Sequence, residues 1–170
     1  MSSGMARRRS TKRRIEHAVR SPGLVKEESE PCPHCASGPE TYGYLRRAYV
    51  YDVDAARQIT SDGREPVELE SDDVAYLVDS NRIHEQHIDH VDPTFPGIIA
   101  HLWGPGEHNA WEHGHLLIDG NHRAARCLRD GLPFRAYVLS ELESEQILKR
   151  GPGRDGVQEL KSQTAAACAE

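Results

Sequence analysis

The chain has 170 residues, a hydrophobic content of 37%, a mean hydropathy of −0.68 and a net charge of −6. This length accommodates one modest domain with a hydrophobic core and additional polar ends. No apolar run reaches the length of a membrane span, and the N-terminus lacks the apolar stretch of a signal peptide. These features argue against a membrane partner and predict a cytoplasmic location.

The charges are unevenly distributed along the chain. Residues 1–20 hold seven of the 21 Lys and Arg residues and one acid, Glu16, so this segment carries a charge of +6. The remainder holds 14 basic and 26 acidic side chains. An acidic body does not favour a polyanion, whereas the basic arm would either contact a nucleic-acid backbone or serve as a solubilising tail. Its polar composition predicts disorder over residues 1–41.

A structured domain is predicted over residues 42–150, followed by a polar tail over 151–170. Aromatic and β-branched residues predict a strand over 44–53, with a turn at 61–63 and a short strand at 67–69. Ser71 then begins a predicted helix, whose apolar residues share one face: Val74, Leu77 and Val78.

The second half of the domain alternates strands and helices. Strands are predicted over 98–103, 115–118 and 134–139, with a polar loop over 104–114. A helix beginning near residue 121 should end at Gly131, a typical C-cap. Ser140 and Glu143 form a predicted capping box for a helix that runs to about Lys149. This order predicts an α+β domain with a small mixed sheet flanked by helices.

The pentapeptide Asp119-Gly120-Asn121-His122-Arg123 lies between a predicted strand and a predicted helix. The first N–H groups of a helix have no intrahelical partner, and the helix dipole adds positive potential at the same end. Gly120 permits close approach of a ligand to the backbone, and Arg123 offers a planar fork for oxyanions. We predict a phosphate site at this turn. The alternative is a helix start capped by Asp119 or Asn121 without any ligand.

The residues from about Pro96 to Leu139, which include PGIIAHLW and GHLLIDGNHRAARCLRDGLPFRAYVL, resemble the ParB/sulfiredoxin superfamily. Free-serine kinases of this superfamily carry a DGHHR-type motif that cradles nucleotide phosphates. The resemblance implies a ParB/sulfiredoxin-like fold and nucleotide binding by Gly120, Asn121, His122 and Arg123. Asn121 stands where sulfiredoxins place a reactive cysteine, which argues against sulfiredoxin chemistry.

The same resemblance implies a catalytic base. The free-serine kinases place a catalytic glutamate in a His-Glu context before the central strand, and His84-Glu85 is similar. A carboxylate near a phosphate cradle takes the proton from an attacking hydroxyl. Four other carboxylates compete for this role: Glu68, Glu70, Asp72 and Asp73. Asp119 is predicted to hold Mg²⁺ that bridges the phosphates, or else to close the turn.

Two further groups of residues are candidate metal ligands. Histidines 84, 87 and 90 recur every third residue, so a helix would bring them near one face; a solvated polar segment is the alternative. Cys32 and Cys35 supply half of a zinc site, which one of these histidines would complete. Cys127 is predicted to be an inert buried thiol. Trp103 and Trp111 flank the polar loop that contains Glu107, His108 and His113, and would line a pocket or pack in the core.

The leading hypothesis is a nucleotide-dependent phosphotransferase that acts on a small hydroxyl-bearing acceptor. Mg²⁺ with ATP or ADP is the expected cofactor, with CTP as a further candidate nucleotide. In this scheme Glu85 and Asp119 are catalytic, and residues 120–123 bind the phosphates. The alternatives are a non-catalytic, nucleotide-responsive module that engages nucleic acid or a protein, and a metal-dependent hydrolase or nuclease.

Overall fold

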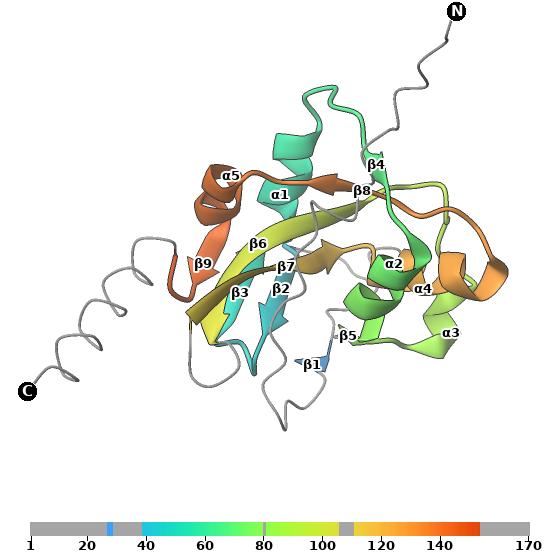
Figure 1. Ribbon diagram of the computed structural model, residues 1–170, viewed down its shortest axis with the longest axis horizontal. Coiled ribbons are helices and arrows are strands. Elements are labelled where there is room, and N and C mark those ends of the chain that lie inside the picture. The colour runs from blue at the N-terminus through green and yellow to red at the C-terminus, as the bar shows by residue number, and fades with distance from the viewer. Residues whose placement is uncertain (1–26, 29–38, 80, 106–110, 154–170) are drawn as a thin grey trace, which may run out of the picture.

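The computed structural model describes residues 27–28, 39–79, 81–105 and 111–153, which form a mixed α+β arrangement (Figure 1). The helices are α1 (Val53–Thr60), α2 (Ser71–Asp79), α3 (Glu85–Ile88), α4 (Asn121–Asp130) and α5 (Glu141–Gln146). The strands are β1 (Glu27–Glu28), β2 (Thr41–Tyr44), β3 (Tyr49–Asp52), β4 (Val67–Glu68), β5 (Asn81–Arg82), β6 (Gly97–Pro105), β7 (Trp111–Asp119), β8 (Arg135–Val138) and β9 (Leu148–Arg150).

The main sheet has the order β4-β8-β6-β7. Strand β6 is antiparallel to β7 and parallel to β8, which confirms the predicted mixed sheet. A second, antiparallel sheet has the order β2-β3-β9, and the short strands β1 and β5 form a parallel pair.

Hydrophobic cores lie on both faces of the β6–β7 hairpin. Alternate residues of a strand point to opposite faces. One face, which includes Ile98, Leu116 and Ile118, packs with the sheet β2-β3-β9 and with α1. The other face, which includes Ile99 and Leu117, packs with α2 and α4. The long hairpin therefore forms the centre of the domain, and the predicted phosphate turn follows directly from its second strand (Figure 1).

The single strand predicted over 44–53 is wrong. The structure has a hairpin in which β2 and β3 pair antiparallel around a turn. Leu45, Arg46 and Arg47 adopt positive φ values of 50°, 53° and 62°, which reverse the chain. A continuous strand would place Arg46 on the same face as the buried Tyr44. The hairpin instead buries Tyr44 and Tyr49 in one core and leaves Arg46 and Arg47 exposed.

Helix α1 was not predicted from the sequence, and the helix predicted after Ser140 was too long. Asp52 caps α1 by accepting a hydrogen bond from the Ala55 N–H at 2.9 Å. The predicted Ser140–Glu143 capping box is confirmed, because each side chain accepts from the backbone N–H of the other residue. However, α5 ends at Gln146, since the Ile147 carbonyl accepts from the Asp52 N–H and the chain continues as β9 beside β3.

The other predicted helices and strands are confirmed in type, but the polar loop predicted over 104–114 is wrong at both ends, because β6 continues to Pro105 and β7 begins at Trp111. Helix α2 begins at Ser71 and buries Val74 and Leu77, and α4 ends at Gly131 with a left-handed φ of 66°. In the described ranges the longest helix, α4, has 10 residues, so none of these helices could cross a membrane. Most of the predicted basic arm, including Cys32 and Cys35, and the tail beyond residue 153 lie outside the described residues.

Candidate functional site

The predicted strand–turn–helix at residues 115–123 is present. Strand β7 ends at Asp119, Gly120 takes the N-cap position with φ 92°, and α4 begins at Asn121. Gly120 has no side chain with which to cap the helix, and its carbonyl accepts from the Ala124 N–H at 2.8 Å. The residues Asn121, His122 and Arg123 are buried, with exposed fractions of 5–7%. The turn therefore places three buried polar residues in the first turn of α4.

Two arginines neutralise Asp119. Its Oδ2 atom accepts from Arg57 Nε at 2.9 Å, and its Oδ1 atom accepts from Arg123 Nη2 at 3.0 Å. Arg57 also pairs with Glu40 at 2.7 Å. Burial raises the pKa of Glu40 above its ordinary value, although Arg57 opposes this shift. The carboxylate of Asp119 thus holds the guanidinium group of Arg123 in place. Through Arg57, the network also links the turn to α1 and to Glu40, just before β2.

The predicted role of Asp119 in holding Mg²⁺ stays a prediction. Both of its carboxylate oxygens contact an arginine in the structure, so a metal ion bound there would share these oxygens with the two guanidinium groups. The geometry does show that Asp119 positions Arg123.

A small hollow lies against the turn. It has a volume of about 20 Å³ and is lined by residues 118–123 together with Glu40, Thr41, Tyr42 and Val91. Two buried polar atoms of its lining residues have no hydrogen-bond partner among the described residues: Arg123 Nε and Asn121 Oδ1. The other amide atom of Asn121, Nδ2, donates to the Leu117 carbonyl at 3.2 Å. Buried polar groups are rarely left unsatisfied, so these two atoms are candidates to bind a polar ligand or water.

His122 is a neutral imidazole whose Nε2 atom accepts a hydrogen bond. Its Nε2 atom accepts from the His84 backbone N–H at 3.2 Å, which places the ring proton on Nδ1. Burial, followed by the nearby His84, His87 and Arg123, lowers the pKa of His122 to about 4. At neutral pH this residue is therefore an uncharged hydrogen-bond donor through Nδ1.

The predicted histidine cluster assembles around His122. The ring centroids of His84 and His87 lie 5.9 and 5.8 Å from that of His122, and His90 lies 6.1 Å from His87. Helix α3 is only four residues long, so it does not extend under all three histidines. In the described ranges, the histidines whose ligand atoms converge are a different set, namely His101, His113 and His115.

Glu85 lies at the first position of α3 and is exposed. Its neighbour His84 contacts His122, so the structure brings the His84-Glu85 pair to the turn. The competing carboxylates Glu68 and Glu70 line another hollow, with Gly131 and Phe134, beyond the opposite end of α4. Asp73 is buried in α2. Glu85 is thus connected to the motif through its neighbour His84.

Sequence reasoning missed His101 and His115, and assigned His113 to a polar loop. The structure places His113 and His115 in β7 and His101 in β6. The spacing His-x-His within a strand puts both rings on one face, and this was the available signal. Trp103 is buried beside His101 and His113, with ring centroids 6.1 and 5.8 Å away. Cys127 is buried as predicted, and burial raises the pKa of its thiol.

Comparison of the chain with models of protein families, with curated proteins and with solved structures gave no match.

Proposed function

We propose that the Asp119–Arg123 turn binds the phosphate groups of a nucleotide, and that the chain transfers a phosphoryl group from it to a small hydroxyl-bearing acceptor. One observation carries the binding step: Arg123 Nε and Asn121 Oδ1 are buried without partners beside a hollow at the start of α4. The transfer step rests on the resemblance of the DGNHR segment to the free-serine kinases. The assignment to a ParB/sulfiredoxin-like fold belongs to the same proposal.

The chemistry of the hollow suits an oxyanion. Arg123 Nε is a donor, and the first N–H groups of α4 lie at the positive end of the helix dipole. A volume of about 20 Å³ holds roughly one water-sized group, so one phosphate oxygen would fill it while the rest of the phosphate remains outside. Asn121 Oδ1, an acceptor, would bind a protonated phosphate oxygen or a bridging water. The positive charges of Arg57 and Arg123 offset the negative charge of Asp119, and burial favours the neutral form of Glu40. Both effects reduce the repulsion of an anion in the hollow.

Phosphoryl transfer then requires a base and a donor. The acceptor hydroxyl attacks phosphorus, an oxygen–phosphorus bond forms, and the bond to the leaving nucleotide oxygen breaks. Glu85 takes the hydroxyl proton, while His122 donates a hydrogen bond from Nδ1 to a phosphoryl oxygen. Mg²⁺ bound with the nucleotide would neutralise part of the charge on the phosphates. Because both oxygens of Asp119 contact arginines, the role of Asp119 in this scheme is to position Arg123.

A variant of Glu85 separates transfer from simple binding. Glu85→Gln should lower phosphoryl transfer by about 10²-fold or more while leaving the nucleotide Kd unchanged. The assay follows conversion of ATP, ADP or CTP with Mg²⁺ in the presence of a panel of small alcohols that includes free serine. Glu70→Gln removes another exposed carboxylate, which lies beside the other hollow, and should change neither quantity.

Nucleotide binding without turnover under any of these conditions would reject the transferase and leave the non-catalytic binding module. Full turnover by Glu85→Gln would reject Glu85 as the base.

A further inference from the structure

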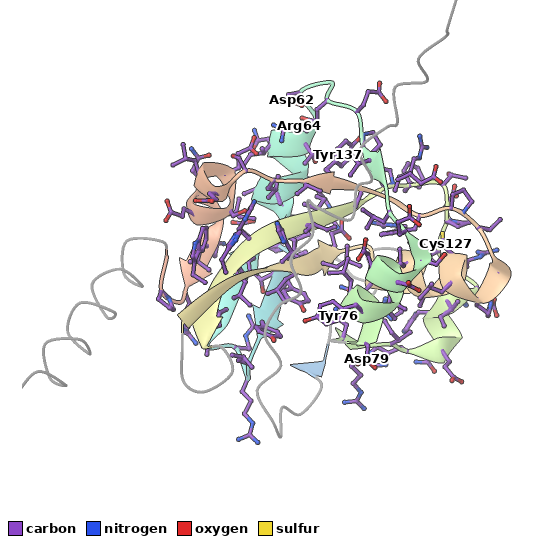
Figure 2. The ribbon with its side chains drawn as sticks, in the orientation of Figure 1. Asp62, Arg64, Tyr76, Asp79, Cys127 and Tyr137 are labelled. Atoms are coloured by element: carbon purple, nitrogen blue, oxygen red, sulfur yellow. The ribbon has the colours of Figure 1, made fainter. Side chains whose placement is uncertain are left out.

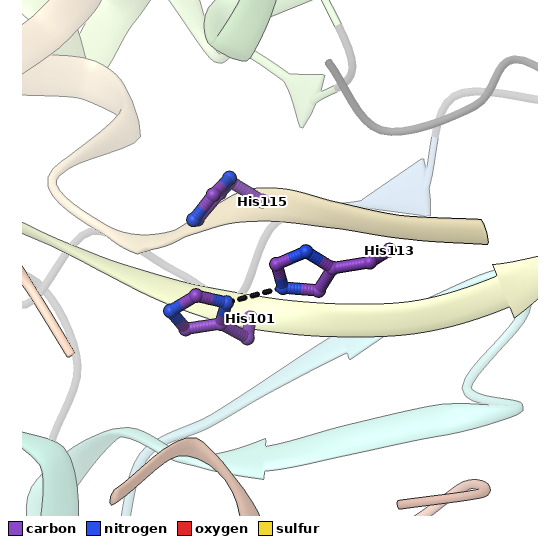
Figure 3. A group of neighbouring side chains, drawn as sticks. All are labelled: His101, His113 and His115. Atoms are coloured by element: carbon purple, nitrogen blue, oxygen red, sulfur yellow. Dashed lines mark hydrogen bonds between the residues drawn. The ribbon is translucent and has the colours of Figure 1, made fainter. Parts of the chain in front are cut away.

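A second polar centre lies on the β6–β7 hairpin, away from the phosphate turn. His101 of β6 stands directly opposite His115 of β7, and His113 stands opposite Trp103. Because side chains alternate between the two faces of a strand, all three imidazoles project from the same face of the hairpin. Figure 3 shows the three rings gathered over the two strands.

The rings are close enough to share one ion. The ring centroid of His101 lies 4.6 Å from that of His113 and 4.5 Å from that of His115. Nitrogens of the three residues lie within 4.8 Å of one another, and His101 Nδ1 contacts His113 Nε2. Tetrahedral zinc with bonds of about 2.0–2.1 Å places its ligand nitrogens about 3.4 Å apart. Binding of a shared ion therefore requires the three side chains to rotate from the present arrangement to this spacing.

The backbone that carries His101 is held on both sides. Its N–H donates to Ser144 Oγ at 2.9 Å, and its carbonyl accepts from the Tyr51 hydroxyl at 3.0 Å. Strands β6 and β7 are paired from Ile98 to Pro105, so the position of His101 relative to the other two histidines is fixed by the ladder. A metal site needs ligands held by such rigid elements.

The ligand set selects the class of metal. Three imidazole nitrogens, with no carboxylate among the converging described residues, suit zinc and neighbouring divalent transition metals rather than Mg²⁺ or Ca²⁺. His115 is 3% exposed, whereas His101 and His113 are half-buried. Three protein ligands leave one tetrahedral position for water or a substrate group, as in catalytic rather than structural zinc sites.

We infer that His101, His113 and His115 bind one divalent transition-metal ion, preferably Zn²⁺, with a water molecule in the fourth position. His115 precedes Asp119 by four residues along β7, a distance of roughly 13 Å in a strand. The ion is therefore too far from the phosphate turn to share ligands with it. A variant can therefore lose metal binding while it retains nucleotide binding, and the reverse.

The test uses the full chain after removal of metal by a chelator. Zn²⁺ affinity is measured by competition with a chromophoric chelator, and the geometry by the visible d–d absorption of the Co²⁺ form. The wild type should bind one ion in a tetrahedral field. His113→Gln and His115→Gln should each weaken binding by about 100-fold or more and abolish the Co²⁺ bands. His90→Gln, an exposed histidine of the other cluster, should match the wild type.

A double variant, Cys32→Ser with Cys35→Ser, identifies the ligands of any zinc that is found. Retention of the ion in this variant and its loss in His113→Gln would support the inference. Loss with the cysteines and retention in His113→Gln would overturn it, as would the absence of stoichiometric binding by the wild type. Circular dichroism and thermal unfolding without metal show whether each variant is folded. Because His113 is half-buried, its variant should retain the wild-type spectrum, and Zn²⁺ should raise the Tm of the wild type but not that of His113→Gln.

Discussion

Gly97 and Gly120 pack backbone against backbone, which joins the start of β6 to the start of α4. A Cβ atom on Gly120 would lie 2.9 Å from the Gly97 Cα, and one on Gly97 would lie 2.8 Å from the Asp119 carbonyl oxygen. Neither position has space for a side chain. The phosphate turn thus has its shape because two glycines allow β6, the end of β7 and α4 to meet.

Substitution of Gly120 by alanine should destabilise the protein more than substitution of Gly131. Both glycines have a left-handed φ, and they lie at the two ends of α4, but a Cβ on Gly131 would meet nothing within 4 Å. Gly131→Ala should therefore cost only the conformational strain, roughly 1–2 kcal/mol. Gly120→Ala adds a backbone clash and should cost more. Urea unfolding of both variants measures the difference; equal costs would show that the contact with Gly97 relaxes freely.

The ion pairs of Asp119 should contribute strongly to stability. Asp119→Asn leaves Arg123, which is 8% exposed, without its carboxylate, so we expect a loss of about 3–5 kcal/mol in the free energy of unfolding. Asp62→Asn is the control: it removes an exposed partner of Arg64 (Figure 2) and should have little effect, because Arg64 keeps Glu143. A small effect of Asp119→Asn would mean that Arg123 finds another partner.

The stability should fall in acid because of His122. Its pKa is about 4 in the folded protein and about 6.5 when unfolded. Between these values the unfolded chain binds a proton that the native protein does not, so the contribution is complete above pH 6.5 and is lost as the pH falls toward 4. We expect a loss on the order of 2–3 kcal/mol over this window. Urea unfolding at several pH values measures it, and His122→Gln should flatten the slope. The same slope in the variant would assign the titration to other groups.

Local signals predicted the elements around the turn correctly. Asp119-Gly120 after an apolar run, Gly131 at the helix end and the Ser140–Glu143 box each act through neighbours in sequence. The turn at Leu45–Arg47 carries no glycine, proline or asparagine, so nothing in its composition separates β2 from β3.

The histidine centre depends on a property that no single segment carries. His101 and His115 are 14 positions apart, and they meet only because β6 and β7 pair in one particular register. A shift of one residue would place His101 on the opposite face relative to its partners. Likewise, Arg57 reaches Asp119 from α1, and this helix was not predicted from the sequence.

The most direct test of the phosphate turn is calorimetric titration of the full chain with ATP, ADP and CTP in the presence of Mg²⁺. Saturable binding should be lost in Arg123→Gln, which removes the buried guanidinium group. It should also be lost in Asn121→Asp, which introduces a negative charge at the hollow although an acidic residue is itself favourable at a helix start. Arg129→Gln removes an exposed arginine from the other end of α4 and should bind as the wild type does. Absence of binding to every nucleotide, or equal binding by all of these variants, would contradict the account.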